Sequence, residues 1–135
     1  MALSPTSSRQ RGIQLTGRRI FVVEDEYFLA DDIDKTFRAF GADVAGPVGH
    51  LDDALKILHD GSVLDGAVLD VNIRSGMIFP IARELKLRGV PFLFTTGYDK
   101  ITLGPEFQDV PLLEKPIDLP AMAQKLAGLM AEPRT

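Results

Sequence analysis

Apolar runs and amphipathic stretches alternate along the chain. Residues 66–70 are apolar until Asp70 and are followed by turn-forming residues at 72–76, which is the pattern of a buried strand. Further apolar runs predict four more strands, at 19–23, 43–47, 91–96 and 111–113. Because most of these runs are apolar without alternation, we expect a sheet that is covered on both faces.

Apolar residues also recur at helical spacing between these runs and predict four helices. The first helix has Leu29, Ile33, Phe37 and Phe40 on its apolar face, and the second has Leu51, Ala54, Leu55 and Leu58. The third lies within Pro80–Leu87, and the last has Leu119, Met122, Leu126, Leu129 and Met130 on its apolar face. Gly41, Gly61 and Gly89 are expected to end the first three helices. Pro80 suits a first helical turn, and Asp118 suits a helix cap.

The order of elements predicts the fold class. If a weak fourth helix between the fourth and fifth strands is counted with these four, strand and helix alternate five times, and right-handed crossovers then give a doubly wound α/β sheet. The length of 135 residues fits the five-stranded, parallel, flavodoxin-like arrangement with strand order 2-1-3-4-5. The fourth helix should be short or irregular, because Gly104 and Pro105 interrupt residues 98–110. We expect one domain at 18–131, between a flexible tail at 1–17 and a short tail at 132–135.

Composition and charge exclude several classes of protein. The chain has no cysteine, which rules out a disulfide framework and thiolate catalysis. The four arginines within residues 1–19 leave a net charge of −8 on the remainder, which argues against binding to nucleic acid. No apolar run approaches the roughly 20 residues of a membrane span, and no secretion signal precedes the domain. We therefore expect a cytoplasmic protein without membrane or nucleic-acid partners.

Reactive polar residues follow four of the five predicted strands. They are Glu24 and Asp25 after the first strand, Asp70 after the third, Thr95 and Thr96 at the fourth, and Lys115 after the fifth. In a doubly wound sheet these strand ends face a common crevice. Three carboxylates held close together require a cation, and oxygen ligands suit Mg²⁺. A lysine and a hydroxyl supply donors to phosphoryl oxygens, so the set indicates phosphoryl transfer to Asp70.

This constellation resembles the receiver domain of two-component response regulators. The resemblance covers residues 19–131 and rests on Glu24-Asp25, Asp70, Thr96-Gly97 and Lys115-Pro116 in that order. It implies that Asp70 accepts a phosphoryl group from a sensor histidine kinase or a histidine phosphotransfer protein. It also implies that Glu24, Asp25 and Asp70 bind Mg²⁺ together with the backbone carbonyl of Asn72. Thr96 and Lys115 would contact the phosphoryl group, and the Lys115–Pro116 bond would be cis.

The fourth strand narrows the resemblance. Phe94–Tyr98 is similar to the signature of the single-domain "FAT GUY" receivers, and Asp70–Asn72 and Pro111–Pro116 match that subgroup as well. Leu112 occupies the place of the switch aromatic of ordinary receivers, so Tyr98 is a candidate for the moving aromatic. Asn72 and Tyr98 also occupy places that tune the lifetime of the phosphoryl group in receivers.

The preferred function is a stand-alone receiver that acts through a downstream protein or as a phosphate sink. Catalysis would be limited to phosphorylation and dephosphorylation of Asp70. His50 and His59 are expected at the surface or at caps, so another protein supplies the phosphoryl group. The first alternative is an aspartate-nucleophile phosphohydrolase, which needs an acid where Asn72 stands. The second is a receiver-like interaction module that is never phosphorylated. A nucleotide-binding flavodoxin-like protein would need a glycine-rich loop after the first strand.

Overall fold

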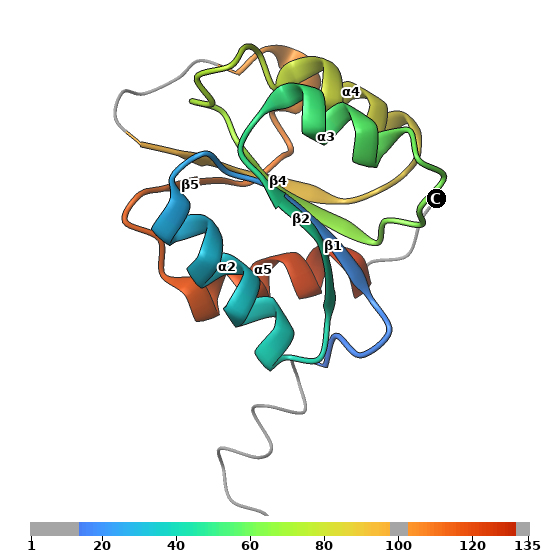
Figure 1. The fold of residues 1–135 in the computed structure, drawn as a ribbon, viewed down its shortest axis with the longest axis vertical. Coiled ribbons are helices and arrows are strands. Elements are labelled where there is room, and N and C mark those ends of the chain that lie inside the picture. The colour runs from blue at the N-terminus through green and yellow to red at the C-terminus, as the bar shows by residue number, and fades with distance from the viewer. Residues whose placement is uncertain (1–13, 98–102, 132–135) are drawn as a thin grey trace, which may run out of the picture.

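A computed structural model describes residues 14–97 and 103–131. Its centre is a parallel sheet of five strands in the order β2-β1-β3-β4-β5 (Figure 1). The strands are β1 Arg19–Val23, β2 Asp43–Val48, β3 Gly66–Asp70, β4 Phe92–Thr96 and β5 Leu112–Glu114. The strand order and the parallel pairing confirm the predicted flavodoxin-like class.

Helices cover both faces of the sheet. They are α2 Tyr27–Ala39, α3 Leu51–Leu58, α4 Phe79–Leu87 and α5 Leu119–Ala131. Figure 1 shows α2 and α5 together on one face and α3 and α4 on the other. Within the described residues, no helix is both long and apolar enough to cross a membrane.

Each face of the sheet has its own hydrophobic core. Phe21, Leu69 and Phe94 belong to the core under α3 and α4, whereas Val68 and Leu93 belong to the core under α2 and α5. Successive side chains of a strand point to opposite faces. A strand between two cores must therefore be apolar at every position, which explains the continuous apolar runs in the sequence.

Several predicted end signals are in place. Gly41 and Gly89 follow their helices with φ of 93° and 71°, backbone angles that a glycine adopts without strain. Pro80 lies in the first turn of α4, and Asp118 accepts a hydrogen bond from the N–H of Ala121 at the start of α5. The helix termini thus follow from local sequence as well as from packing.

The segment between β4 and β5 is irregular where it is described. It contains a single 3₁₀ turn, Pro105–Phe107, rather than an α-helix. Phe107 is buried and packs against the rings of Phe79, Phe92 and Phe94. Burial of the Phe107 side chain anchors this 3₁₀ turn against the sheet, in place of a regular helix. Tyr98 and the rest of 98–102 lie outside the described residues.

The N-terminal contacts of the domain begin earlier than we expected. Leu15 is buried in the core under α2 and α5, and its N–H donates to the carbonyl of Phe40. In the described part of the chain, contacts with the domain thus include Leu15, three residues before the expected boundary at residue 18. The tails predicted at 1–17 and 132–135 stay predictions, because residues 1–13 and 132–135 lie outside the described part.

Candidate functional site

Asp70 ends the central strand β3, which is paired with β1 and β4. The N–H of the following residue, Val71, donates to the carbonyl of Thr95 on β4. This bond and the pairing with the two neighbouring strands fix the backbone at Asp70. The Asp70 side chain is 1% exposed, and its Oδ1 accepts the N–H of Asn72 at 2.8 Å. A carboxylate is thus fixed rigidly at the edge of the sheet where parallel strands end.

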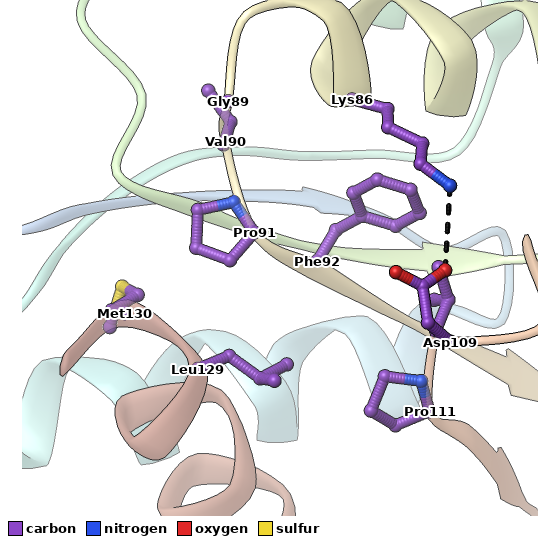
Figure 2. A pocket seen from close by; sticks show the side chains of 10 residues that line it. Lys86, Gly89, Val90, Pro91, Phe92, Asp109, Pro111, Leu129 and Met130 are labelled. Carbon is purple, nitrogen blue, oxygen red and sulfur yellow. Dashed lines mark hydrogen bonds and ion pairs between the residues drawn. The ribbon is translucent and has the colours of Figure 1, made fainter. Parts of the chain in front are cut away.

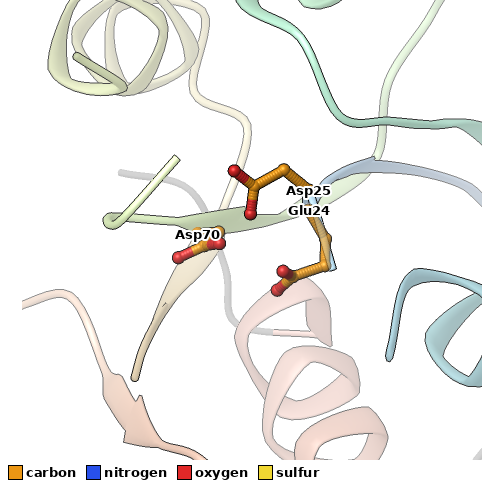
Figure 3. A group of neighbouring side chains, drawn as sticks. All are labelled: Glu24, Asp25 and Asp70. Carbon is orange, nitrogen blue, oxygen red and sulfur yellow. The ribbon is translucent and has the colours of Figure 1, made fainter. Parts of the chain in front are cut away.

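Two further carboxylates come from the end of β1. One oxygen from each of Glu24, Asp25 and Asp70 lies within 4.8 Å of the other two. Figure 3 shows the three carboxylates gathered where β1 and β3 end side by side. Glu24 is 2% exposed, and its Oε1 has no hydrogen-bond partner among the described residues. We call these three residues the acidic cluster.

Lys115 brings a positive charge to this cluster from the end of β5. Its Nζ lies 3.1 Å from Oε2 of Glu24, 3.1 Å from Oε1 of Glu26 and 3.4 Å from Oδ2 of Asp70. The backbone N–H of Lys115 donates to the carbonyl of Thr96 at 2.8 Å, and the Lys115–Pro116 bond is cis, as the resemblance implied. The ammonium group is therefore held over two members of the cluster.

Burial and mutual charge change the protonation of the site. Burial raises the pKa of Glu24 from 4.5 to about 7, and the charge of Asp70 adds to the rise. Burial by itself would lower the pKa of Lys115, but the charge of Glu24 and the hydrogen bond to Glu26 outweigh it and raise that pKa. Glu24 therefore exchanges a proton close to neutral pH while Lys115 stays charged.

Arg74, in the loop after β3, contacts the third member of the cluster. Oδ2 of Asp25 accepts the backbone N–H of Arg74 at 2.9 Å and its Nε–H at 3.2 Å. Burial would raise the pKa of Asp25, but these two hydrogen bonds outweigh it and lower the pKa below its ordinary value. Asp25 is consequently ionised wherever Arg74 holds it.

The two threonines at the end of β4 have different surroundings. Thr96 Oγ1 donates to Oδ1 of Asn72 at 3.0 Å, and the N–H of Gly97 donates to the same oxygen at 2.8 Å. Because the backbone N–H of Gly97 can only donate, it is the amide oxygen of Asn72, and not the amide nitrogen, that faces Gly97 and Thr96. Thr95 is fully buried, and its Oγ1 has no partner among the described residues. Of the two hydroxyls, that of Thr96 thus faces the loop beside the cluster.

A cavity of about 410 Å³ opens onto these groups. It is lined by Asp25, Glu26, Asp70, Asn72, Arg74, Gly97 and Lys115. Glu24 and Thr96 are absent from this lining, because Glu24 lies below the surface and Thr96 is turned to Asn72. The structure therefore brings all six predicted site residues to one edge of the sheet, four of them at the wall of the cavity.

A second cavity, which we call the amino-edge pocket, lies at the opposite end of the strands. Its volume is about 240 Å³, and it is lined by residues just before or at the start of β4 and β5 and at the ends of α4 and α5. Figure 2 shows proline, phenylalanine, leucine and methionine side chains around it and an ion pair between Lys86 and Asp109. This pocket contains no group of carboxylates and is separate from the acidic cluster.

The comparisons with known proteins point to one family. No protein-family model matches the chain, and neither does any curated protein. The solution structure of SdrG from Sphingomonas melonis Fr1 is 31% identical, with a TM-score of 0.72, over 85% of this chain and 97% of SdrG. The BeF3-activated conformation of SdrG from Pseudomonas melonis Fr1 is 33% identical, with a TM-score of 0.66, over 87% and 98%.

A third structure has the same fold at lower identity. The non-phosphorylated receiver domain of HemR from Leptospira biflexa is 24% identical, with a TM-score of 0.73, over 87% of this chain and 98% of that domain. The chain belongs to the response regulator receiver family. The family prediction made from four strand-end motifs is thereby confirmed. The narrower assignment to the FAT GUY subgroup stays a prediction.

Leu112 stands where the resemblance to receivers implies a switch aromatic. The residue begins β5, pairs with Phe94 on β4 and is partly buried against the core under α3 and α4. Tyr98, the predicted replacement for the switch aromatic, lies outside the described residues. In the described part of this receiver, the aromatic nearest in sequence to Leu112 is therefore Phe107, which is buried rather than exposed.

Sequence reasoning missed three features of this receiver's site. Glu26 shares Lys115 with the cluster, a contact that the sequence did not predict. Arg74 reaches Asp25, and the Asn72 side chain accepts a hydrogen bond from Thr96; neither contact was predicted. A basic residue four positions after Asp70, in a loop at the same sheet edge, was the available signal for Arg74.

Proposed function

We propose that this receiver accepts a phosphoryl group on Asp70 from the phosphohistidine of a sensor histidine kinase or a histidine phosphotransfer protein. One observation carries the proposal above the others. The buried Asp70 carboxylate lies within 4.8 Å of two other carboxylates and 3.4 Å from the ammonium of Lys115. A carboxylate with charge-neutralising neighbours suits the role of a phosphoryl acceptor.

The proposed reaction forms one bond and breaks one. A carboxylate oxygen of Asp70 attacks the phosphorus, the bond from phosphorus to the imidazole nitrogen of the donor breaks, and that nitrogen takes up a proton. The product on this receiver is an acyl phosphate. Lys115 neutralises charge on the transferred oxygens, and Thr96 would leave Asn72 to donate its hydroxyl to one of them.

We propose Mg²⁺ as the cation of the acidic cluster. Glu24, Asp25, Asp70 and the backbone carbonyl of Asn72 would hold it. The fit rests on three clustered carboxylates and on Glu24 Oε1, a buried oxygen without a hydrogen-bond partner among the described residues. Oxygen ligands of this kind suit a hard divalent cation. When bound, such a cation would neutralise charge on phosphoryl oxygens.

The output of this receiver would be a change in protein binding. SdrG, 33% identical to this chain, has a BeF3-activated conformation, which supports an activated state here as well. We propose that the phosphorylated form binds or releases a downstream protein in the cytoplasm, or drains phosphoryl groups from a kinase. The predicted membership of the FAT GUY subgroup belongs to this proposal.

Phosphorylation by a small donor tests the acceptor. Acetyl phosphate with Mg²⁺ should add one acid-labile phosphoryl group, visible by intact-protein mass spectrometry. Asp70→Asn should abolish the addition. Asp60→Asn is the matched control, because Asp60 is exposed at the end of α3 and only accepts the N–H of Ser62. It should be labelled like the wild type.

Two results would count against the proposal. Equal labelling of Asp70→Asn and wild type would move the acceptor to another residue. A wild-type protein that takes no phosphoryl group from acetyl phosphate or from a phosphorylated histidine protein would favour the non-phosphorylated interaction module. The phosphohydrolase alternative gains no support, since position 72 holds an amide that accepts two hydrogen bonds instead of a second acid.

A further inference from the structure

Arg74 is the one basic side chain, within the described residues, that pairs with Asp25. Its backbone N–H and its Nε–H both donate to Oδ2 of Asp25, at 2.9 Å and 3.2 Å. Asp25 is also one of the three carboxylates proposed to hold the divalent cation. The guanidinium group and the cation therefore have the same carboxylate within reach.

The guanidinium group of Arg74 and a divalent cation would repel each other if both stayed beside Asp25. The three carboxylates of the acidic cluster carry three negative charges when all are ionised. Lys115 contacts Glu24, Glu26 and Asp70, so its one charge is shared among three carboxylates. A guanidinium group that stays on Asp25 would place a second positive charge beside the cation on that same carboxylate, which is repulsive at this range.

Arg74 is better able to leave than Lys115. The Arg74 side chain is 83% exposed and has no second acidic partner in the described part of the chain. The Lys115 side chain is only 11% exposed and contacts three carboxylates. An exposed arginine regains full hydration when it leaves its partner, whereas Lys115 would leave three carboxylates without its charge. Displacement of Arg74 is therefore the change with the smaller cost.

The backbone bond allows this displacement without loss of order at Asp25. The N–H of Arg74 stays on Oδ2 of Asp25 whether or not the guanidinium does, because it depends on the loop and not on the side chain. Both bonds from Arg74 are to Oδ2, so Oδ1 of Asp25 is open to the cation, and departure of the guanidinium removes the positive charge beside it. We propose that Arg74 is a positioning residue that exchanges with the divalent cation at Asp25, and so weakens the affinity of the site for that cation.

This inference rests on the proposed magnesium site and is tested by metal binding itself. The titrations use Mg²⁺ alone, at fixed ionic strength, on the full chain, with isothermal titration calorimetry as the readout. Arg74→Met keeps the length of the side chain and the backbone N–H but removes the charge. We expect it to bind Mg²⁺ about two- to tenfold more tightly than the wild type.

Two other variants separate a specific exchange from a general effect of charge. Arg88→Met loses the same charge at the far end of α4, where Arg88 pairs with Glu84, and should bind Mg²⁺ like the wild type. Arg74→Lys keeps a charge that can reach Asp25 and should restore most of the wild-type affinity. The rise in melting temperature on adding Mg²⁺ should likewise be larger for Arg74→Met than for the wild type.

The outcomes distinguish this inference from the function on which it rests. Equal or weaker Mg²⁺ binding by Arg74→Met would overturn the exchange and leave the magnesium site intact. Equal tightening in Arg88→Met would also overturn it, since the effect would then come from net charge. Absence of Mg²⁺ binding in the wild type and in every variant would overturn the magnesium site, and the exchange with it. Phosphorylation of Asp70 by acetyl phosphate is measured separately.

Discussion

The two ends of the sheet hold the same pair of residue types in different surroundings. At the acidic cluster, Lys115 and Asp70 lie 3.4 Å apart with side chains 11% and 1% exposed. At the amino-edge pocket, Lys86 and Asp109 lie 3.4 Å apart as well, but their side chains are 45% and 77% exposed. Identical distances therefore describe one pair that is largely buried and one that is surrounded by water.

The difference shows why burial, more than contact distance, marks the functional end of this receiver. Charges that are shielded from water shift one another's protonation and cannot lose a partner without a large cost. An exposed pair is screened by solvent and contributes little. The following changes test this contrast, beginning with the largest expected effect.

Loss of Lys115 should be the most damaging change. Lys115→Met leaves Glu24 and Asp70 facing each other without a cation, so we expect the free energy of unfolding at pH 7 in EDTA to fall by about 2–4 kcal/mol. Lys86→Met, the matched change at the amino-edge pocket, should cost less than about 1 kcal/mol. Urea unfolding measures both values. Similar losses in the two variants would break the contrast between the ends of the sheet.

The pH dependence of stability should differ in sign between the two ends. Burial raises the pKa of Glu24 to about 7, so the folded protein holds this proton more tightly than the unfolded chain does. The resulting stabilisation is complete below pH 4.5 and is lost as the pH rises through about 7. Glu24→Gln in EDTA should therefore gain stability relative to the wild type between pH 5 and pH 8.

Glu106, near the amino-edge pocket, is the control for this measurement. The hydrogen bond from Arg83 lowers the pKa of Glu106, so its stabilisation is present above the ordinary pKa of 4.5 and lost below it. Glu106→Gln should be less stable than the wild type at pH 7, and the difference should disappear as the pH falls through 4.5 and below. The same sign of pH dependence in both variants would contradict the assigned surroundings.

The adjacent threonines sharpen the contrast within the functional end. Thr96→Val removes the hydroxyl that donates to Asn72, and should lower the free energy of unfolding by about 1 kcal/mol. Thr95→Val replaces a buried hydroxyl without a partner among the described residues, and should be neutral or stabilising. Chemical denaturation compares the two. A larger loss for Thr95→Val would show that its hydroxyl has a partner.

The smallest effect is expected for Asp109→Asn at the amino-edge pocket. The exposed pair with Lys86 is screened, so the free energy of unfolding should change by no more than about 0.5 kcal/mol. Thermal and urea unfolding at low and high salt measure this change. A loss above about 1 kcal/mol that disappears in high salt would show that this exposed ion pair contributes more free energy than its exposure indicates.

Local sequence was enough to predict most of the fold. The strands were predicted from short apolar runs, the helix ends from glycines, and the irregular segment from Gly104-Pro105. Each of these signals involves only residues that are close together in the chain. The strand order then followed from chain length and from the handedness of crossovers. The early anchor at Leu15 was missed, because a single leucine in a polar stretch has no periodic pattern to mark it.

The site was predictable only in part, for the same reason. Strand ends identified Glu24, Asp25, Asp70, Thr96 and Lys115, since parallel strands bring their carboxyl ends to one edge. Which charged groups pair at that edge was not predictable. Arg74 and Asp25 are 49 positions apart, and Asn72 and Thr96 are 24 apart, so no local spacing links them.

By itself, then, the sequence determined the alternation of strands and helices, the receiver family and the set of reactive residues. Only the tertiary structure decided the protonation of Glu24, the sharing of Lys115 with Glu26, and the contact of Arg74 with Asp25. The physical reason is range. Backbone preference and apolar periodicity act between near neighbours in the chain, whereas burial and charge act through space between residues that folding brings together.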